Sequence, residues 1–65
     1  MTELTAIVIE PSYVIRAGWV QVLRSFEEIA YVYDFSDPEE CWPLLEKYHP
    51  DLILYHMKGM YGETN

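Results

Sequence analysis

The sequence predicts a small α/β domain in which three parallel strands alternate with two helices along the chain. Residues 5–9 include a short apolar run without alternation, typical of a strand covered on both faces, and the third predicted strand, residues 51–56, contains a second apolar run. Apolar residues at helical spacing occur between the predicted strands, and each predicted helix has ten or more residues. Connections of that length favour parallel pairing with right-handed crossovers. A chain of 65 residues forms at most one such domain.

Composition excludes several classes of function. Half of the chain (51%) is hydrophobic and 15% is aromatic, which indicates a packed core rather than disorder. The net charge of -7 argues against nucleic acid or an anionic membrane as the ligand of this segment. The longest apolar runs have four residues, too few to cross a bilayer. With one cysteine and no signal-peptide pattern, we expect a cytoplasmic protein.

The first predicted strand, residues 5–9, ends at Glu10 and Pro11, and Ser12 can cap a helix over residues 13–26. Five apolar residues form one stripe that we expect to face the sheet: Ile15, Trp19, Val22, Leu23 and Phe26. Trp19 is therefore predicted in the core, and Gly18 is predicted to let the helix approach the sheet closely. A weaker stripe (Tyr13, Ala17, Val20) suggests that this helix packs on two sides or meets a partner.

The second strand is predicted at residues 30–33, where Asp34 interrupts it as an edge strand would tolerate. Ser36 is the expected cap of the second helix, whose inner stripe is Cys41, Leu44, Leu45 and Tyr48. Pro43 should kink this helix and Pro50 should end it. Residues 58–65 indicate a loop or frayed tail.

If the first strand lies in the middle, in the order 2-1-3, the two crossovers run in opposite directions and place their helices on opposite faces. Functional groups then collect beyond the carboxyl ends of the first and third strands. The residues at that place are Glu10, Pro11 and His56.

The chain resembles the amino-terminal half of a two-component response-regulator receiver domain of the LuxR/NarL type, a truncated flavodoxin-like unit. The resemblance covers about residues 5–58 and rests on four segments in the family's order. They are Ile7-Val8-Ile9-Glu10, Arg16-Ala17-Gly18-Trp19, Ser36-Asp37-Pro38-Glu39-Glu40 and Pro50-Asp51-Leu52-Ile53-Leu54.

The resemblance implies a degenerate phosphorylation site. The family's Mg²⁺-binding acidic pair falls on Glu10 and Pro11, and its phosphoacceptor aspartate falls on His56. One carboxylate with an imidazole and an imide ring is a poor Mg²⁺ site. We therefore expect no catalytic residue, no metal, no cofactor and no enzyme activity. The remaining strands and helices of a receiver, with its switch hydroxyl and lysine, would lie beyond Asn65.

Individual residues have simpler interpretations beside the functional ones. An ordinary hydrogen bond or ion pair is favoured for His56 over a role as phosphoacceptor or metal ligand. Glu10 is an inherited remnant or the partner of His56, with the remnant favoured. His49 is expected at a polar helix end. Cys41 is expected to be a small core residue rather than a nucleophile.

Half of a receiver leaves an apolar third strand with an open edge, and such edges recruit partners. We expect a protein partner, with a homodimer or swapped oligomer through the third strand as the first candidate. The possible interface residues are Trp42, Leu52, Leu54 and Tyr55. The leading hypothesis is a phosphorylation-independent pseudo-receiver that regulates signalling or transcription. The alternatives are a phosphorelay or metal-binding role of His56 with Glu10, or a shortened form of a DNA-binding response regulator.

Overall fold

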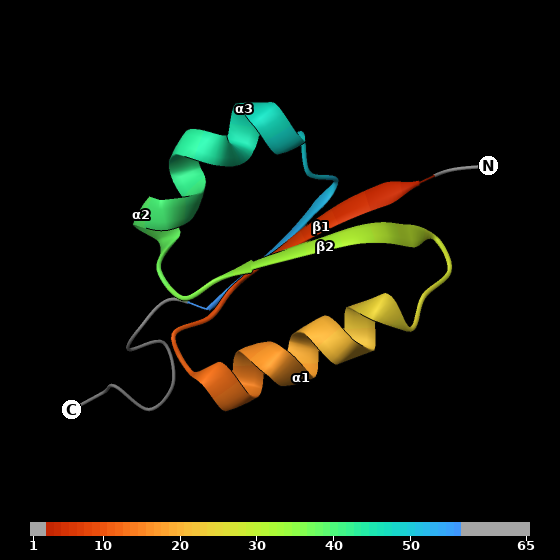
Figure 1. Cartoon of the computed structure of the whole chain (residues 1–65), viewed down its shortest axis with the longest axis horizontal. Coiled ribbons are helices and arrows are strands. Elements are labelled where there is room, and N and C mark those ends of the chain that lie inside the picture. The colour runs from red at the N-terminus through yellow and green to blue at the C-terminus, as the bar shows by residue number, and fades with distance from the viewer. Residues whose placement is uncertain (1–2, 57–65) are drawn as a thin grey trace.

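The computed structural model describes residues 3–56, which form a three-stranded parallel sheet in the order β2-β1-β3 (Figure 1). The strands are β1 (Leu4–Ile9), β2 (Ile29–Phe35) and β3 (Leu52–Tyr55). Helix α1 (Tyr13–Arg24) lies on one side of the sheet; α2 (Pro38–Cys41), a 3-10 turn (Trp42–Leu44) and α3 (Leu45–Tyr48) lie on the other. The predicted fold class and strand order are confirmed. The prediction for residues 58–65 lies outside the described part of the chain.

Strand β1 is covered on both faces, which explains why its apolar residues do not alternate with polar ones. Ala6 and Val8 pack against Leu23 of α1 in one core cluster. Ile7 and Ile9 pack against Cys41 in a second cluster on the opposite face. The small thiol of Cys41 is fully buried, so its predicted place in the core is confirmed.

Helix α1 begins as predicted, because the Ser12 hydroxyl accepts a hydrogen bond from the Ile15 N–H. It ends at Arg24, before the expected residue 26, where the Ser25 N–H bonds to the carbonyls of Val22 and Leu23. The side of α1 that meets the sheet is also not the predicted one. Within the predicted stripe only Leu23 is buried, and its neighbour in the core is Val20 from the weaker stripe.

Trp19 and Gly18 therefore do not have the roles expected for them. Trp19 is 44% exposed rather than buried in the core. A Cβ atom placed on Gly18 would meet nothing within 4 Å, so this glycine does not mark a close approach of helix and sheet. Val20 and Leu23 are three residues apart and share the face of α1 that meets the sheet. Trp19 and Gly18 lie outside that face.

Strand β2 is longer than predicted and runs through Asp34, which pairs with Val8 of β1. The interruption expected at Asp34 is absent because its carboxylate points out of the sheet to Arg16, at 3.0 Å from the guanidinium Nε. β2 is an edge strand, so a charged side chain can reach solvent there without losing a ladder hydrogen bond.

The segment between β2 and β3 is helical but broken. Asp37, and not Ser36, caps it: the Asp37 carboxylate accepts a hydrogen bond from the Glu39 N–H. The kink expected at Pro43 appears as the 3-10 turn that separates α2 from α3. His49 lies at the helix end as predicted, in the left-handed region with φ of 48°, and its N–H donates to the Leu45 carbonyl.

Strand β3 pairs with β1 over four residues. It starts one residue later and ends one residue earlier than the predicted range, residues 51–56. Its start is fixed by two bonds between Thr5 and Asp51: the Asp51 N–H donates to the Thr5 carbonyl, and the Thr5 N–H donates to the Asp51 carboxylate, both at 2.8 Å. Among the described residues, none of the helices has the length and apolar character needed to cross a membrane.

Candidate functional site at the carboxyl ends of the strands

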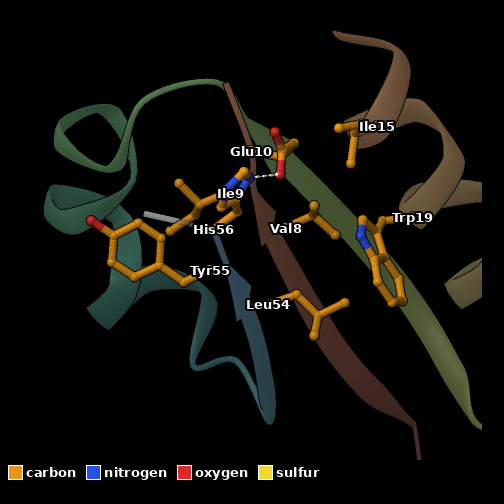
Figure 2. Close-up of a pocket in the computed structure, with 8 residues that line it drawn as sticks. All are labelled: Val8, Ile9, Glu10, Ile15, Trp19, Leu54, Tyr55 and His56. Atoms are coloured by element: carbon orange, nitrogen blue, oxygen red, sulfur yellow. Dashed lines mark hydrogen bonds and ion pairs between the residues drawn. The ribbon is translucent and has the colours of Figure 1, made fainter. Parts of the chain in front are cut away.

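Glu10 and His56 meet at the carboxyl ends of β1 and β3, as the strand order requires. The Nδ1 atom of His56 lies 2.6 Å from Oε1 of Glu10 (Figure 2). Because β1 and β3 are parallel and paired, the residues that follow their last ladder positions emerge side by side. The fold therefore brings together two of the three residues that the sequence placed at this site.

Glu10 is the centre of the hydrogen-bond network here and is only 2% exposed. Its Oε2 accepts from the Ser12 N–H at 3.0 Å, while Oε1 contacts His56. Its own N–H donates to the Phe35 carbonyl, and its carbonyl accepts from Nη1 of Arg16 at 2.8 Å. One buried residue thus links the ends of all three strands to the start of α1.

Arg16 is a site residue whose role the sequence did not predict. Its guanidinium donates to the Glu10 carbonyl through Nη1 and to Asp34 of β2 through Nε. The same guanidinium lies 5.6 Å from the centre of the Tyr13 ring, within cation–π range. An arginine one turn into the first helix and an acid late in the second strand are the sequence signals that could have suggested this contact.

His56 is held by its backbone as well as by its ring. Its N–H donates to the Ile9 carbonyl at 2.9 Å, which continues the β1–β3 ladder by one bond. A carboxylate can only accept hydrogen bonds, so Nδ1 of His56 is the donor when Glu10 is ionised. Glu10 is therefore the partner of His56, and the interpretation of His56 as an ordinary hydrogen-bonding residue agrees with this geometry.

The site does not fit the Mg²⁺ ion that the receiver resemblance implies. Mg²⁺ requires near-octahedral oxygen ligands. Both carboxylate oxygens of Glu10 already accept hydrogen bonds from the protein, and Pro11 offers no side-chain oxygen. Within residues 3–56 there is no group of three or more His, Cys, Asp or Glu side chains placed to hold a metal.

An open pocket of about 140 Å³ lies beside the Glu10–His56 pair (Figure 2). Its apolar lining comes from β1, β3 and α1, with Val8 and Leu54 in the sheet and Ile15 and Trp19 on the helix. The pocket has apolar walls from the sheet and from α1, and its polar groups are those of the Glu10–His56 pair at one end. Such a lining favours contact with an apolar group over binding of a hydrophilic ion.

The four possible interface residues divide between the two faces of the sheet. Leu52 and Leu54 alternate with Ile53 and Tyr55 along β3, so Leu54 packs with the α1 cluster. Tyr55 makes an edge-on contact with Trp42 on the opposite face of the sheet, with the ring centres 5.6 Å apart. The four residues therefore do not form one continuous patch.

Cys41 lies in the core cluster with Ile7 and Ile9, on the sheet face opposite α1. Burial raises the pKa of the Cys41 thiol, which disfavours the nucleophilic thiolate. The interpretation of this cysteine as a packing residue agrees with both observations.

No protein-family model, no curated protein and no solved structure matches the chain. The fold and the geometry of the site are therefore the basis of the functional argument.

Proposed function

We propose that this chain is a phosphorylation-independent pseudo-receiver: a regulatory module of a cytoplasmic signalling or transcription-control protein that works through protein contacts. The proposal is supported by the three-stranded order β2-β1-β3 together with the residues at its switch point. Sheets of this type concentrate functional groups at that crevice, where β1 and β3 end. The crevice of this chain is occupied by a closed carboxylate–imidazole pair.

The single observation that carries the proposal is the 2.6 Å contact between Glu10 and His56. Transfer of a phosphoryl group to a receiver needs a carboxylate nucleophile and a cation that neutralises the phosphate oxygens. The residue that carries the carboxylate, Glu10, is only 2% exposed, and its two carboxylate oxygens accept hydrogen bonds within the protein. A module built in this way transmits a signal by binding, since the chemical switch has no acceptor.

The kind of partner follows from charge and exposure. A net charge of -7 disfavours nucleic acid and anionic lipid, so any DNA-binding function belongs to another domain or subunit. The described surface carries large apolar side chains on α1 and β3, which suits a protein partner. A second copy of the chain, as a homodimer or swapped oligomer, is the first candidate.

One observation favours a second function. A carboxylate bonded to one imidazole nitrogen fixes the orientation of the ring, as in metal-bound and nucleophilic histidines. On this alternative His56 would accept a phosphoryl group or bind a metal with the help of Glu10.

The two functions are separated by incubating the protein with acetyl phosphate and Mg²⁺ and measuring its intact mass. The proposed function predicts an unmodified mass and no saturable Mg²⁺ binding in calorimetry. A stable adduct of one phosphate that is lost in His56→Gln and kept in His49→Gln would overturn the proposal in favour of the alternative. His49 is the matched control because it is the chain's other histidine and lies at the end of α3.

A further inference from the structure

Helix α1 carries a row of large apolar side chains that the sheet does not cover. Val20 and Leu23 face the sheet, but Ile15, Trp19 and Val22 are each 44–47% exposed. Phe26, just past the helix, continues the spacing and is also exposed. Positions 15, 19 and 22 lie on one side of a helix, about a quarter turn from the line through Val20 and Leu23. The row therefore points sideways along the sheet.

This row and the sheet together form what we call the α1 groove, lined by Val8, Ile15, Trp19 and Leu54 and closed at one end by the Glu10–His56 pair (Figure 2). Helix α1 packs mainly on β2 and β1, so it covers the same face of β3 only in part. Leu52 is on the same face as Leu54 and is 40% exposed. An apolar corner between a helix and a sheet has the shape that a second helix fills.

The chain itself contains a helix that meets the requirements of this groove. The occupant needs an uncharged apolar face, because the groove is lined by apolar side chains. Helix α1 has 12 residues, the apolar row just described and no acidic residue. The other helices of residues 3–56, α2 and α3, have four residues each and carry Glu39, Glu40 and Glu46. The α1 helix of a second copy is therefore the occupant that the described part of the chain can supply.

The spacing of the row also suits pairing with itself. Ile15, Trp19, Val22 and Phe26 are separated by four, three and four residues, a sequence that reads the same in both directions. Two such helices in antiparallel contact about a two-fold axis place Trp19 against Val22 of the second copy and Ile15 against its Phe26. A two-fold contact requires this kind of self-complementary surface.

Charge supports the same occupant. Helix α1 contributes Arg16 and Arg24 and no acid, a charge of +2, so the rest of the chain carries -7 - 2 = -9. Contact through α1 brings together the least acidic surface and keeps the acidic remainder apart. The guanidinium of Arg16 is already paired with Asp34, so it adds little repulsion.

We propose that two copies of the chain associate through α1, each helix lying antiparallel in the α1 groove of the other. This inference rests on the proposed function, since it names the partner and the surface of that interaction module. The two can fail separately, because a phosphate adduct would refute the regulatory proposal and a monomer would refute the dimer.

The test combines sedimentation equilibrium with native mass spectrometry on the 65-residue chain. The parent chain is expected to form dimers at micromolar concentration. Trp19→Lys and Val22→Glu each place two charges in the apolar contact and should weaken the dimer at least about tenfold. Val14→Glu is the matched control, because Val14 is an exposed apolar residue of the same helix at 77% exposure, outside the row. It should dimerise like the parent.

Mixing the two weakened variants gives the decisive measurement. In the mixed dimer the ammonium group introduced by W19K in one copy would face the carboxylate introduced by V22E in the other. The symmetry-related contact, between Val22 of the W19K copy and Trp19 of the V22E copy, keeps both native residues. The mixed dimer should therefore form at least about tenfold more tightly than either variant alone. Far-UV circular dichroism of each variant checks that it remains folded.

Three results would overturn the inference. One is a folded parent chain that remains monomeric at all concentrations tested. Another is a dimer that W19K and V22E leave intact but that a charge on the open edge of β3, such as Ile53→Lys, disrupts. The last is a mixture of W19K and V22E that associates no better than its components.

If the W19K and V22E variants fail to fold, Trp19→Ala and Val22→Ala test the same surface without buried charge. A dimer that both alanine variants leave intact would then overturn the inference.

Discussion

Glu10 shows how much structure can depend on one buried side chain. Its carboxylate connects the His56 ring to the Ser12 N–H, and its backbone reaches Phe35 and Arg16. A buried carboxylate is stable only when its hydrogen-bonding capacity is satisfied. Within residues 3–56 no buried side-chain nitrogen or oxygen lacks a partner. Removing this one carboxylate would take an acceptor from two polar groups at once.

We therefore expect Glu10→Ala to lower the free energy of unfolding by about 2–4 kcal/mol, because it removes the acceptor of both the His56 Nδ1 and the Ser12 N–H. Glu10→Gln keeps the shape and one acceptor and should cost about 1–2 kcal/mol. Urea unfolding measures both. Glu27→Gln, the same change on an exposed residue, should stay within about 0.5 kcal/mol. Equal effects at the two positions would contradict the importance of the buried contact.

Cys41 gives a prediction about pH. Burial raises the pKa of the folded thiol, so above about pH 8.5 the unfolded chain loses a proton that the folded chain keeps. The stability that the buried thiol contributes is fully present below the pKa of the thiol in the unfolded chain. It declines as pH rises towards the pKa of the thiol in the folded chain, by at most about 1.4 kcal/mol per pH unit. The stability difference between the parent and Cys41→Ala should shrink over this range. Parallel pH curves for the two proteins would show that the thiol is not responsible.

Helix α1 is attached to the sheet by one arginine as well as by its apolar side. Arg16 bonds to the end of β1 and to β2, and its planar guanidinium can make both contacts at once. The Asp34 side chain is 47% exposed, so solvent weakens the bond between Arg16 and Asp34. Most of the contribution should therefore come from the bond to the Glu10 carbonyl.

Arg16→Lys should lower the free energy of unfolding by about 1 kcal/mol, because an ammonium group cannot satisfy both acceptors from one position. Arg24→Lys is the control, because it makes the same substitution in the same helix at an exposed position. Its effect should be a few tenths of a kcal/mol, on the order of other surface changes. Thermal and urea unfolding of the two variants should rank them in this order; the reverse ranking would exclude the bridging role of Arg16.

Helix α1 shows why the predicted core of this chain differs from the observed one. It has two apolar sides, and periodicity alone cannot say which of them meets the sheet. The sequence pattern favours the longer row for the core, but the structure places Val20 and Leu23 there. Similarly, Ser36 and Asp37 are both good caps, and only the backbone shows that Asp37 performs this role.

The parallel order and the central strand were predictable from the sequence. An apolar run without alternation and two long connections leave few other arrangements for a chain of this size. The meeting of Glu10 with His56 follows from that order. The bond of Arg16 to Asp34 could have been suggested by their opposite charges, but its bond to the Glu10 carbonyl could not, because a backbone carbonyl leaves no signal in the sequence.

The charge of -7 predicts that salt stabilises the folded chain. Self-repulsion among acids is screened as the Debye length falls from about 30 Å at 0.01 M salt to about 8 Å at 0.15 M. We expect the free energy of unfolding to rise by a few tenths to about 1 kcal/mol over this range. Urea titrations at the two ionic strengths measure it. A decrease would mean that ion pairs such as Arg16–Asp34 outweigh the general repulsion.

The bonds at both ends of β3 have a mechanical consequence. Thr5 and Asp51 hold its start to β1, and His56 holds its end through Ile9 and Glu10. If tension is applied to the chain at residues 3 and 56, it pulls β1 and β3 in opposite directions along their common axis. The ladder bonds between them are then loaded together rather than one after another. Pulling on β2 from its open edge would break bonds singly, so this small sheet should resist stretching far better than peeling.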